Sequence, residues 1–282
     1  MMPLPLIFWR CLLFVPGSRP DRFAKALASG ADAVCVDLED AVPPSEKLQA
    51  REIALRWLAE PGSGQSVARV VRCNAVSSQE GIDDVRALVA AGCRPDVLMV
   101  PKVNDAAELR IIHDLWPQSA PPLLAIVESP AGVLNAATIA AQAGAGLLLG
   151  AVDLAAALGV GPASPALAFA KGQVVFAAKA AHVQVLDTPA LSVADTAELS
   201  AEARSARAWG FTGKAAIHPR QVPDIQTAFT PTEDELATAQ RALAAFAAGG
   251  ERAMLFEGRL LEKPIVEGYR RTLFLAARTA QG

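Results

Sequence analysis

The stretch ADAVCVDLEDAV (residues 31–42) decides the fold, because it joins a short, continuous apolar run, AVCVD (33–37), to a cluster of acidic residues. A continuous apolar run, unlike an alternating one, indicates a strand that is buried on both faces, as in a parallel sheet. Seven more runs of this kind occur, each followed by a helix-like stretch: CLLFV (11–15), VARVVRC (67–73), VLMVP (97–101), LLAIVE (123–128), GLLLG (146–150), VQVLD (183–187) and KAAIH (214–218). Eight β-α units favour a closed (β/α)₈ TIM barrel over an open doubly wound sheet.

The length of the chain fits one such barrel. A TIM barrel takes ~250 residues, and the chain has 282. We expect residues 1–248 to form the barrel and residues 249–282 to form a short helical extension, which is too short for a domain and would pack on a neighbouring subunit. No G-x-G-x-x-G follows the first run, which argues against a dinucleotide-binding fold.

The composition excludes several classes of partner. The net charge is −3 and the pI about 5.7, whereas nucleic acids and anionic membranes are bound by basic patches. The four cysteines stand singly, as is typical of reduced thiols in a cytoplasmic protein. The uncharged stretch 129–152 is interrupted by Pro130 and by glycines, so we expect a helix, a turn and a buried strand there rather than a membrane span.

Polar side chains follow nearly all of the apolar runs. In a TIM barrel the carboxyl ends of the strands meet at one mouth, where the active site lies. These side chains are therefore the candidate site residues: Arg19, Asp37, Glu39, Asp40, Arg72, Lys102, Glu128, Asp153, Asp187 and His218.

Two carboxylates among them suit a metal ion. Glu128 and Asp153 follow successive strands, and neighbouring strands lie ~5 Å apart, so both carboxylates would reach one cation. Hard oxygen ligands and few protein contacts favour Mg²⁺, which keeps several waters and takes further oxygens from a substrate. Arg72 at the same mouth would pair with a substrate carboxylate. The set predicts a site for a 2-oxo acid, with the metal as Lewis acid.

Three of the other residues leave alternatives open. Lys102 would either form a Schiff base, as in a metal-free aldolase, or pair with the acidic residues 37–40, and the metal pair favours the ion pair. His218 would be a general base or, as we expect, a structural residue. Asp187 would cap a helix or line the mouth, and we favour the mouth.

Several motifs resemble a known family. They are LLFVPGSRPDRFAKAL (12–27), ADAVCVDLEDAV (31–42), VVRCNA (70–75), VPKV (100–103), AIVESPAGVLNA (125–136), GAVDLAAALG (150–159) and GFTGKAAIHPRQV (210–222). Together they resemble the citrate lyase beta subunit group of the HpcH/HpaI aldolase superfamily over nearly the full length. The resemblance implies a (β/α)₈ barrel assembled as a trimer or hexamer. It also implies cleavage or formation of citryl-, malyl- or methylmalyl-type thioesters through an enolate stabilised by Mg²⁺.

The resemblance also implies roles for particular residues. Glu128 and Asp153 would be the Mg²⁺ ligands, and Arg72 would bind the substrate carboxylate. The acidic loop, Asp37 to Asp40, would hold metal-bound water and orient Arg72 or Lys102. Catalytic roles would then fall to Arg72, Asp37 and Asp40, and substrate-binding roles to Arg72, Glu39, Lys102 and Arg19. The segment with Arg19 and Arg22 would meet the acyl thioester of coenzyme A or of a carrier protein.

The chain departs from the family pattern near the metal pair and in the tail. Val152 stands where many members have an acidic residue, and Ala157 where many have Asp. Glu262, in GRLLEKP (258–264), stands at the place of a tail aspartate that serves as an acid/base group in a neighbouring subunit's site. We expect Glu262 to take that catalytic role, or else to form a surface ion pair. The departures keep two alternatives open: a pyruvate-releasing 4-hydroxy-2-oxo acid aldolase, and a non-catalytic or complex-dependent lyase subunit.

Overall fold

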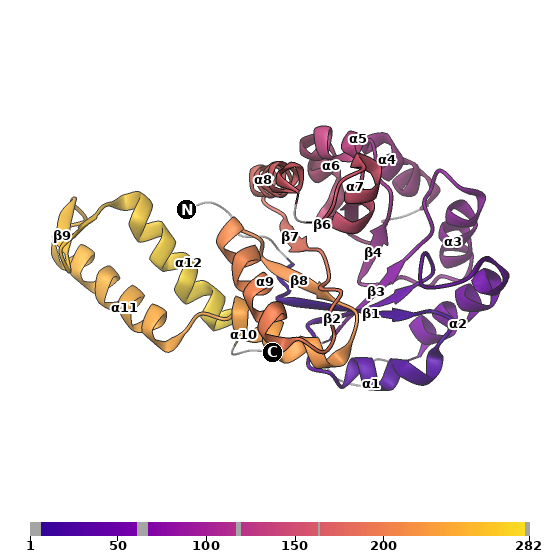
Figure 1. Ribbon diagram of the computed structural model, residues 1–282, viewed down its shortest axis with the longest axis horizontal. Coiled ribbons are helices and arrows are strands. Elements are labelled where there is room, and N and C mark those ends of the chain that lie inside the picture. Colours follow the sequence, from indigo (N-terminus) through magenta and orange to yellow (C-terminus); the bar gives the residue numbers. More distant parts are fainter. Residues whose placement is uncertain (1–6, 61–66, 117–119, 163, 280–282) are drawn as a thin grey trace. The chain divides into compact units, whose positions relative to one another are not determined.

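The computed structural model describes residues 7–60, 67–116, 120–162 and 164–279. Eight parallel strands close into a barrel in the order of the chain, as Figure 1 shows, which confirms the predicted TIM barrel. The observed ends differ from the predicted ones by at most two residues. The strands are β1 (Cys11–Pro16), β2 (Ala33–Asp37), β3 (Ala68–Arg72), β4 (Val97–Val100), β5 (Leu123–Val127), β6 (Gly144–Leu149), β7 (Gln184–Asp187) and β8 (Gly213–Ala216).

Helices follow the strands and surround the barrel (Figure 1). Many begin at a polar residue that caps the helix, as when Ser78 accepts a hydrogen bond from the Gly81 N–H and Ser129 one from the Gly132 N–H. They are η1 (Pro20–Arg22), α1 (Phe23–Leu27), η2 (Pro44–Glu46), α2 (Lys47–Ala59), α3 (Gln79–Ala90), α4 (Ala106–Leu115), α5 (Pro130–Leu134), α6 (Ala136–Ala143), α7 (Ala151–Leu158), α8 (Pro165–Ala180), α9 (Thr196–Trp209), η3 (Pro219–Gln221) and α10 (Val222–Phe229).

The uncharged stretch 129–152 forms α5, α6 and β6, as the sequence predicted. Among the residues that the structure describes, no helix is both long and apolar enough to cross a membrane.

Side chains that alternate along the strands fill the barrel interior and also set the direction of the strand-end residues. Cys35, Val70 and Ile126 belong to the buried cluster inside the barrel. Because side chains two residues apart on a strand face the same side, the next inward positions are Asp37, Arg72 and Glu128. The same period that builds the apolar core therefore directs these three polar side chains into the mouth.

The last part of the chain forms its own compact unit from Thr227 onwards. It contains α11 (Glu233–Ala248), a two-stranded antiparallel hairpin of β9 (Met254–Phe256) and β10 (Arg259–Leu261), and α12 (Lys263–Thr279). The core of this unit is small and consists of Ala242, Phe246, Leu261 and Val266. The other compact unit ends at Gln226, so α11 groups with the hairpin and α12, with which it packs. That residues 249–282 pack on a neighbouring subunit stays a prediction.

Candidate active site

Arg72 and Asp37 form a bidentate ion pair at the ends of β3 and β2. The Arg72 Nε donates to Asp37 Oδ1 at 2.6 Å, and its Nη2 donates to Oδ2 at 2.5 Å. Asp37 and Arg72 are also register partners in the sheet, so the strands bring the two groups together. Burial by itself lowers the pKa of Arg72, but the hydrogen bond and charge of Asp37 hold that pKa above its usual range. Arg72 is therefore a permanent cation at the mouth.

The acidic loop after β2 joins Arg72 to Lys102. The Glu39 Oε2 lies 3.0 Å from Arg72 Nη1, and Oε1 of the same carboxylate accepts a hydrogen bond from Lys102 Nζ. Lys102 Nζ also lies 3.3 Å from Asp40 Oδ1. Burial raises the pKa of Glu39, and the carboxylates of the loop hold the pKa of Lys102 above its usual range against the effect of its own burial. The contacts of Lys102 Nζ with Glu39 and Asp40 confirm the predicted ion pair with the acidic loop. A lysine that keeps its proton is also a poor Schiff-base nucleophile.

Lys102 also contacts the candidate metal ligand through its main chain. Its N–H donates to Glu128 Oε1 at 2.6 Å. The residue has a φ of 56°, a left-handed conformation that residues other than glycine adopt at a cost in free energy. One residue therefore ties the acidic loop to Glu128: the ammonium contacts the loop and the amide contacts the carboxylate.

Glu128 and Asp153 lie on neighbouring parts of the mouth, as predicted. Glu128 directly follows β5 and is 6% exposed, while Asp153 lies in the first turn of α7, after β6. Gly150 packs so closely against Glu128 that a Cβ there would lie 2.5 Å from the Glu128 Cβ, so this position requires glycine. Burial raises the pKa of Glu128 to about 8; the Lys102 N–H opposes that rise, and the charges of Asp153 and Glu39 add to it. The negative charge gathered here would be relieved by a cation.

The donor set fits a hard divalent cation with few protein ligands. In the described ranges, no group of three or more histidine, cysteine, aspartate or glutamate side chains is placed to hold a metal ion. A cation at Glu128 and Asp153 would thus depend on water and substrate oxygens, which is how Mg²⁺ is usually bound. The buried Glu39 Oε2 accepts no hydrogen bond, and its contact with Arg72 Nη1 at 3.0 Å is an ion pair.

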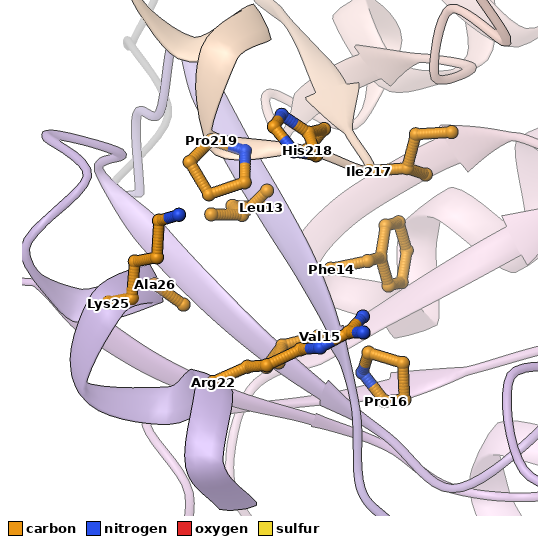
Figure 2. Close-up of a pocket in the computed structure, with 10 residues that line it drawn as sticks. All are labelled: Leu13, Phe14, Val15, Pro16, Arg22, Lys25, Ala26, Ile217, His218 and Pro219. Carbon is orange, nitrogen blue, oxygen red and sulfur yellow. The ribbon is translucent and has the colours of Figure 1, made fainter. Parts of the chain in front are cut away.

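A pocket of about 330 Å³ opens beside this cluster, between β1, α1 and the end of β8 (Figure 2). Its apolar wall includes Phe14 and Ile217, and Arg22 and Lys25 supply cationic side chains at its edge. The Arg72 guanidinium lies over the Phe14 ring, 5.0 Å from its centroid. The Phe14 side chain therefore lies between the pocket and the Arg72 guanidinium.

Two strand-end residues, Asp187 and His218, have structural roles. Asp187 does not line the mouth, so that prediction was wrong: it is 2% exposed and accepts a hydrogen bond from Lys214 Nζ at 2.8 Å. Lys214 also pairs with Glu202 of α9, which places the pair between the sheet and the helices. His218 caps η3, because its Nδ1 accepts from the Arg220 N–H at 3.1 Å. This is the structural role that we expected for His218.

The remaining predicted residues lie outside this cluster. Arg19 forms an exposed bidentate pair with Asp21 and does not line the pocket, whereas Arg22 of the same segment does. Glu262 belongs to the C-terminal unit, between β10 and α12. Sequence reasoning missed Lys47, whose ammonium donates to the main chain of the acidic loop. Nothing in the sequence marks it, because an isolated lysine at a helix start is usually solvated.

The inward-facing Arg72 and the buried Glu128 end neighbouring parts of one barrel mouth, and the exposed Asp153 follows the strand next to Glu128. Residues 10–219 match the family model for HpcH/HpaI aldolase/citrate lyase. The chain belongs to this family of metal-dependent lyases, which confirms both the resemblance and the expected class of enzyme.

Three relatives illustrate the match. The chain is 35% identical to the (3S)-malyl-CoA thioesterase of Cereibacter sphaeroides over 96% of each chain. It is similar to the crystal structure of CitE from Mycobacterium tuberculosis in complex with magnesium, acetoacetate and coenzyme A, with 34% identity, a TM-score of 0.81 and coverage of 96% of this chain and 98% of that one. It is also similar to the citrate lyase beta subunit of that organism complexed with oxaloacetate and magnesium, with 35% identity, a TM-score of 0.69 and coverage of 79% and 98%. Magnesium in both complexes agrees with the predicted cofactor.

Proposed function

We propose that this protein is a Mg²⁺-dependent carbon–carbon lyase that cleaves or forms a 3-hydroxy-dicarboxylic acyl thioester of the citryl, malyl or methylmalyl type. The observation that carries the proposal is the pair of contacts made by Lys102. Its ammonium contacts Glu39, which pairs with Arg72, and its main-chain N–H donates to Glu128. A permanent cation and a pair of metal-binding carboxylates at one mouth suit a 2-oxo acid, because such a product has one carboxylate and one oxo group to bind.

Glu128 and Asp153 are the residues that would hold Mg²⁺. When bound, the ion supplies Lewis acidity to the oxo group of the substrate. The carboxylate of Glu128 must give up its proton for this, and its raised pKa makes the affinity for the ion depend on pH. The acidic loop supplies an acceptor for water at the site in the exposed carboxylate of Asp40.

Arg72 would bind the substrate carboxylate. A guanidinium has five N–H donors, and Asp37 accepts from Nε and from one position on Nη2. The second N–H of Nη2 would contact the substrate, together with Nη1, which also lies 3.0 Å from Glu39 Oε2. Because Asp37 fixes the plane of the guanidinium, little conformational entropy is lost when the carboxylate binds.

The acyl thioester would extend into the pocket beside Phe14. The apolar wall suits a pantetheine-like arm, and Arg22 and Lys25 suit its phosphate groups. The similar CitE structure contains coenzyme A, and the similar Cereibacter protein is a malyl-CoA thioesterase, which supports coenzyme A or an acyl-carrier protein as the thiol partner. We place the protein in the cytoplasm as a homotrimer or homohexamer, in which Glu262 of a neighbouring subunit would transfer the proton that the cleaved thioester takes up.

The test is turnover of purified protein on citryl-, malyl- and methylmalyl-CoA, with and without EDTA. We expect one of them to yield a 2-oxo acid and a shorter acyl-CoA, and EDTA to abolish the reaction. Turnover that persists in EDTA, or in Arg72→Ala, would refute the proposal. A pyruvate–lactate dehydrogenase assay with a free 4-hydroxy-2-oxo acid tests the aldolase alternative.

Thioester hydrolysis is the second candidate, because the Cereibacter relative is named a (3S)-malyl-CoA thioesterase and matches 96% of the chain. The two reactions differ in their products. Carbon–carbon cleavage of malyl-CoA gives glyoxylate and acetyl-CoA, whereas hydrolysis gives malate and free coenzyme A. A thiol reagent detects only the free coenzyme A, and phenylhydrazine detects only the glyoxylate, so one incubation separates the candidates.

A further inference from the structure

Lys47 donates hydrogen bonds to two carbonyl oxygens of the acidic loop and to the side chain of Asn74. It stands at the start of α2, and its Nζ lies 2.9 Å from Leu38 O, 2.8 Å from Glu39 O and 2.6 Å from Asn74 Oδ1. An ammonium has three N–H groups, so these bonds use all of them. Two of the acceptors are the carbonyls of the very segment that carries Glu39. Lys47 therefore fixes the main chain of the loop at Leu38 and Glu39.

Asn74, which receives the third bond, is itself held by buried groups. Its N–H and its Nδ2 both donate to Asp84 Oδ2, at 2.8 and 2.6 Å. Arg51 Nε donates to the other oxygen of Asp84 at 2.6 Å. Asn74 and Asp84 are 5% and 1% exposed. The result is a chain of hydrogen bonds, Arg51–Asp84–Asn74–Lys47, that runs from α2 and α3 to the loop; we call it the loop anchor.

The loop anchor determines where two carboxylates can be. Glu39 pairs with Arg72 on one side and with Lys102 on the other, and both contacts depend on the main-chain direction at Leu38 and Glu39. Without Lys47, the two carbonyls would lose a charged donor. The main chain of the loop could then move relative to the Arg72 guanidinium.

We propose that Lys47 is a positioning residue for Arg72: through the loop anchor it holds the acidic loop so that the guanidinium keeps one orientation at the mouth. The substrate-binding part of this inference rests on the proposed function. A misplacement of ~1 Å in such a group can cost a hundredfold in rate, so a lysine that never touches the substrate would still set its affinity.

Two measurements on Lys47→Met test the proposal, since methionine keeps the apolar stem and removes the donors. The first is the rate at which phenylglyoxal, an arginine reagent, labels Arg72 under native conditions, followed by mass spectrometry of the peptide. The second is the affinity for oxaloacetate in the presence of Mg²⁺, measured by calorimetry. Arg10→Met is the matched control, because the Arg10–Asp32 pair is partly buried but lies at the amino end of β1, at the opposite end of the barrel.

We expect Lys47→Met to label Arg72 severalfold faster than wild type and to bind oxaloacetate about tenfold more weakly. Arg10→Met should lose thermal stability without either change. Arg51→Met, at the far end of the loop anchor, should shift both readouts in the same direction by less, and it serves as the test if Lys47→Met does not fold. A lowered melting temperature with unchanged labelling and affinity would overturn the proposal and leave Lys47 a purely structural residue. If wild-type protein binds no oxaloacetate, the proposed function fails, and the labelling rate alone decides the role of Lys47.

Discussion

At the ends of β2, β3 and β5, Asp37, Arg72 and Glu128 face the barrel interior and interact with one another or through Lys102. At the end of β7, Asp187 faces the helices and pairs with Lys214, which is 1% exposed. In the sequence the acidic strand ends Asp37, Glu128 and Asp187 look alike. The difference is one of parity: Asp37 follows the interior residue Cys35 by two positions, whereas Asp187 follows the interior residue Leu186 by one. At the ends of β2, β3, β5 and β7, the charges that continue the inward set reach the site, and Asp187, which does not continue it, pairs behind the sheet.

The largest loss of activity is expected from a substitution of Arg72, which faces the barrel interior. Arg72→Met should lower kcat/KM by about a thousandfold, because truncating one partner of a buried, hydrogen-bonded charge pair costs about 2–5 kcal/mol. Steady-state turnover of the thioester that the wild type prefers measures this, with circular dichroism to verify folding. Arg10→Met, at the other end of the barrel, should stay close to wild type. A loss in Arg72→Met no larger than in this control would remove Arg72 from the site.

A pair of matched substitutions separates the two kinds of strand end. Asp153→Asn should weaken Mg²⁺ binding by about a hundredfold and change stability little, because the side chain is exposed. Asp187→Asn should do the reverse: the buried Lys214 would keep only its longer contact with Glu202, at 3.3 Å, and the loss of its nearer partner should cost up to about 3–5 kcal/mol, while Mg²⁺ affinity stays the same. Urea unfolding and calorimetric Mg²⁺ titration of both variants measure the difference. Weaker Mg²⁺ binding in Asp187→Asn would contradict the distinction between the two faces.

The raised pKa of Glu128 predicts a pH dependence with a definite sign. The folded protein keeps this proton up to a pKa of about 8, whereas an unfolded carboxyl loses it near its ordinary pKa of 4.5. Between these values the folded state binds more protons, so the stability of the metal-free protein falls as pH rises from 4.5 to 8. Mg²⁺ competes with the same proton, so its affinity should rise by up to about tenfold per pH unit below 8.

Urea unfolding in EDTA between pH 5 and 9, compared with Glu128→Gln, measures that dependence. The variant has no titrating group at this position and should lose this part of the slope. An identical slope in both proteins would mean that another group titrates.

The smallest effect is expected at the end of β8. His218→Ala should change kcat by no more than about twofold, since the imidazole caps η3, whereas removal of a general base costs about 10²–10⁴-fold. The lost cap should lower stability by about 1 kcal/mol. Turnover across pH 6–9 and a thermal melt measure both. A loss of a hundredfold or more would place His218 among the catalytic residues instead.

The sequence predicts most of the barrel because eight continuous apolar runs leave few other folds. It also predicts Arg72 and Glu128, which end their runs directly. The sequence shows that Val185 and Asp187 share one face and Leu186 the other, but only the structure shows that Leu186 faces the interior, because both faces of the run are apolar. Lys47 could not be found, because its role depends on three segments brought together by folding: the loop after β2, Asn74 after β3, and α2. The left-handed conformation of Lys102 likewise has no sequence signal.

The most direct test of the central claim is a crystal structure of the protein with Mn²⁺ and oxaloacetate, with anomalous data collected at the manganese edge. We expect one peak at ligand distance, about 2.0–2.2 Å, from the carboxylates of Glu128 and Asp153, with a carboxylate of oxaloacetate against Arg72. An anomalous peak away from Glu128 and Asp153, or oxaloacetate bound away from both of these side chains, would contradict the claim that they hold the metal at which the 2-oxo acid binds.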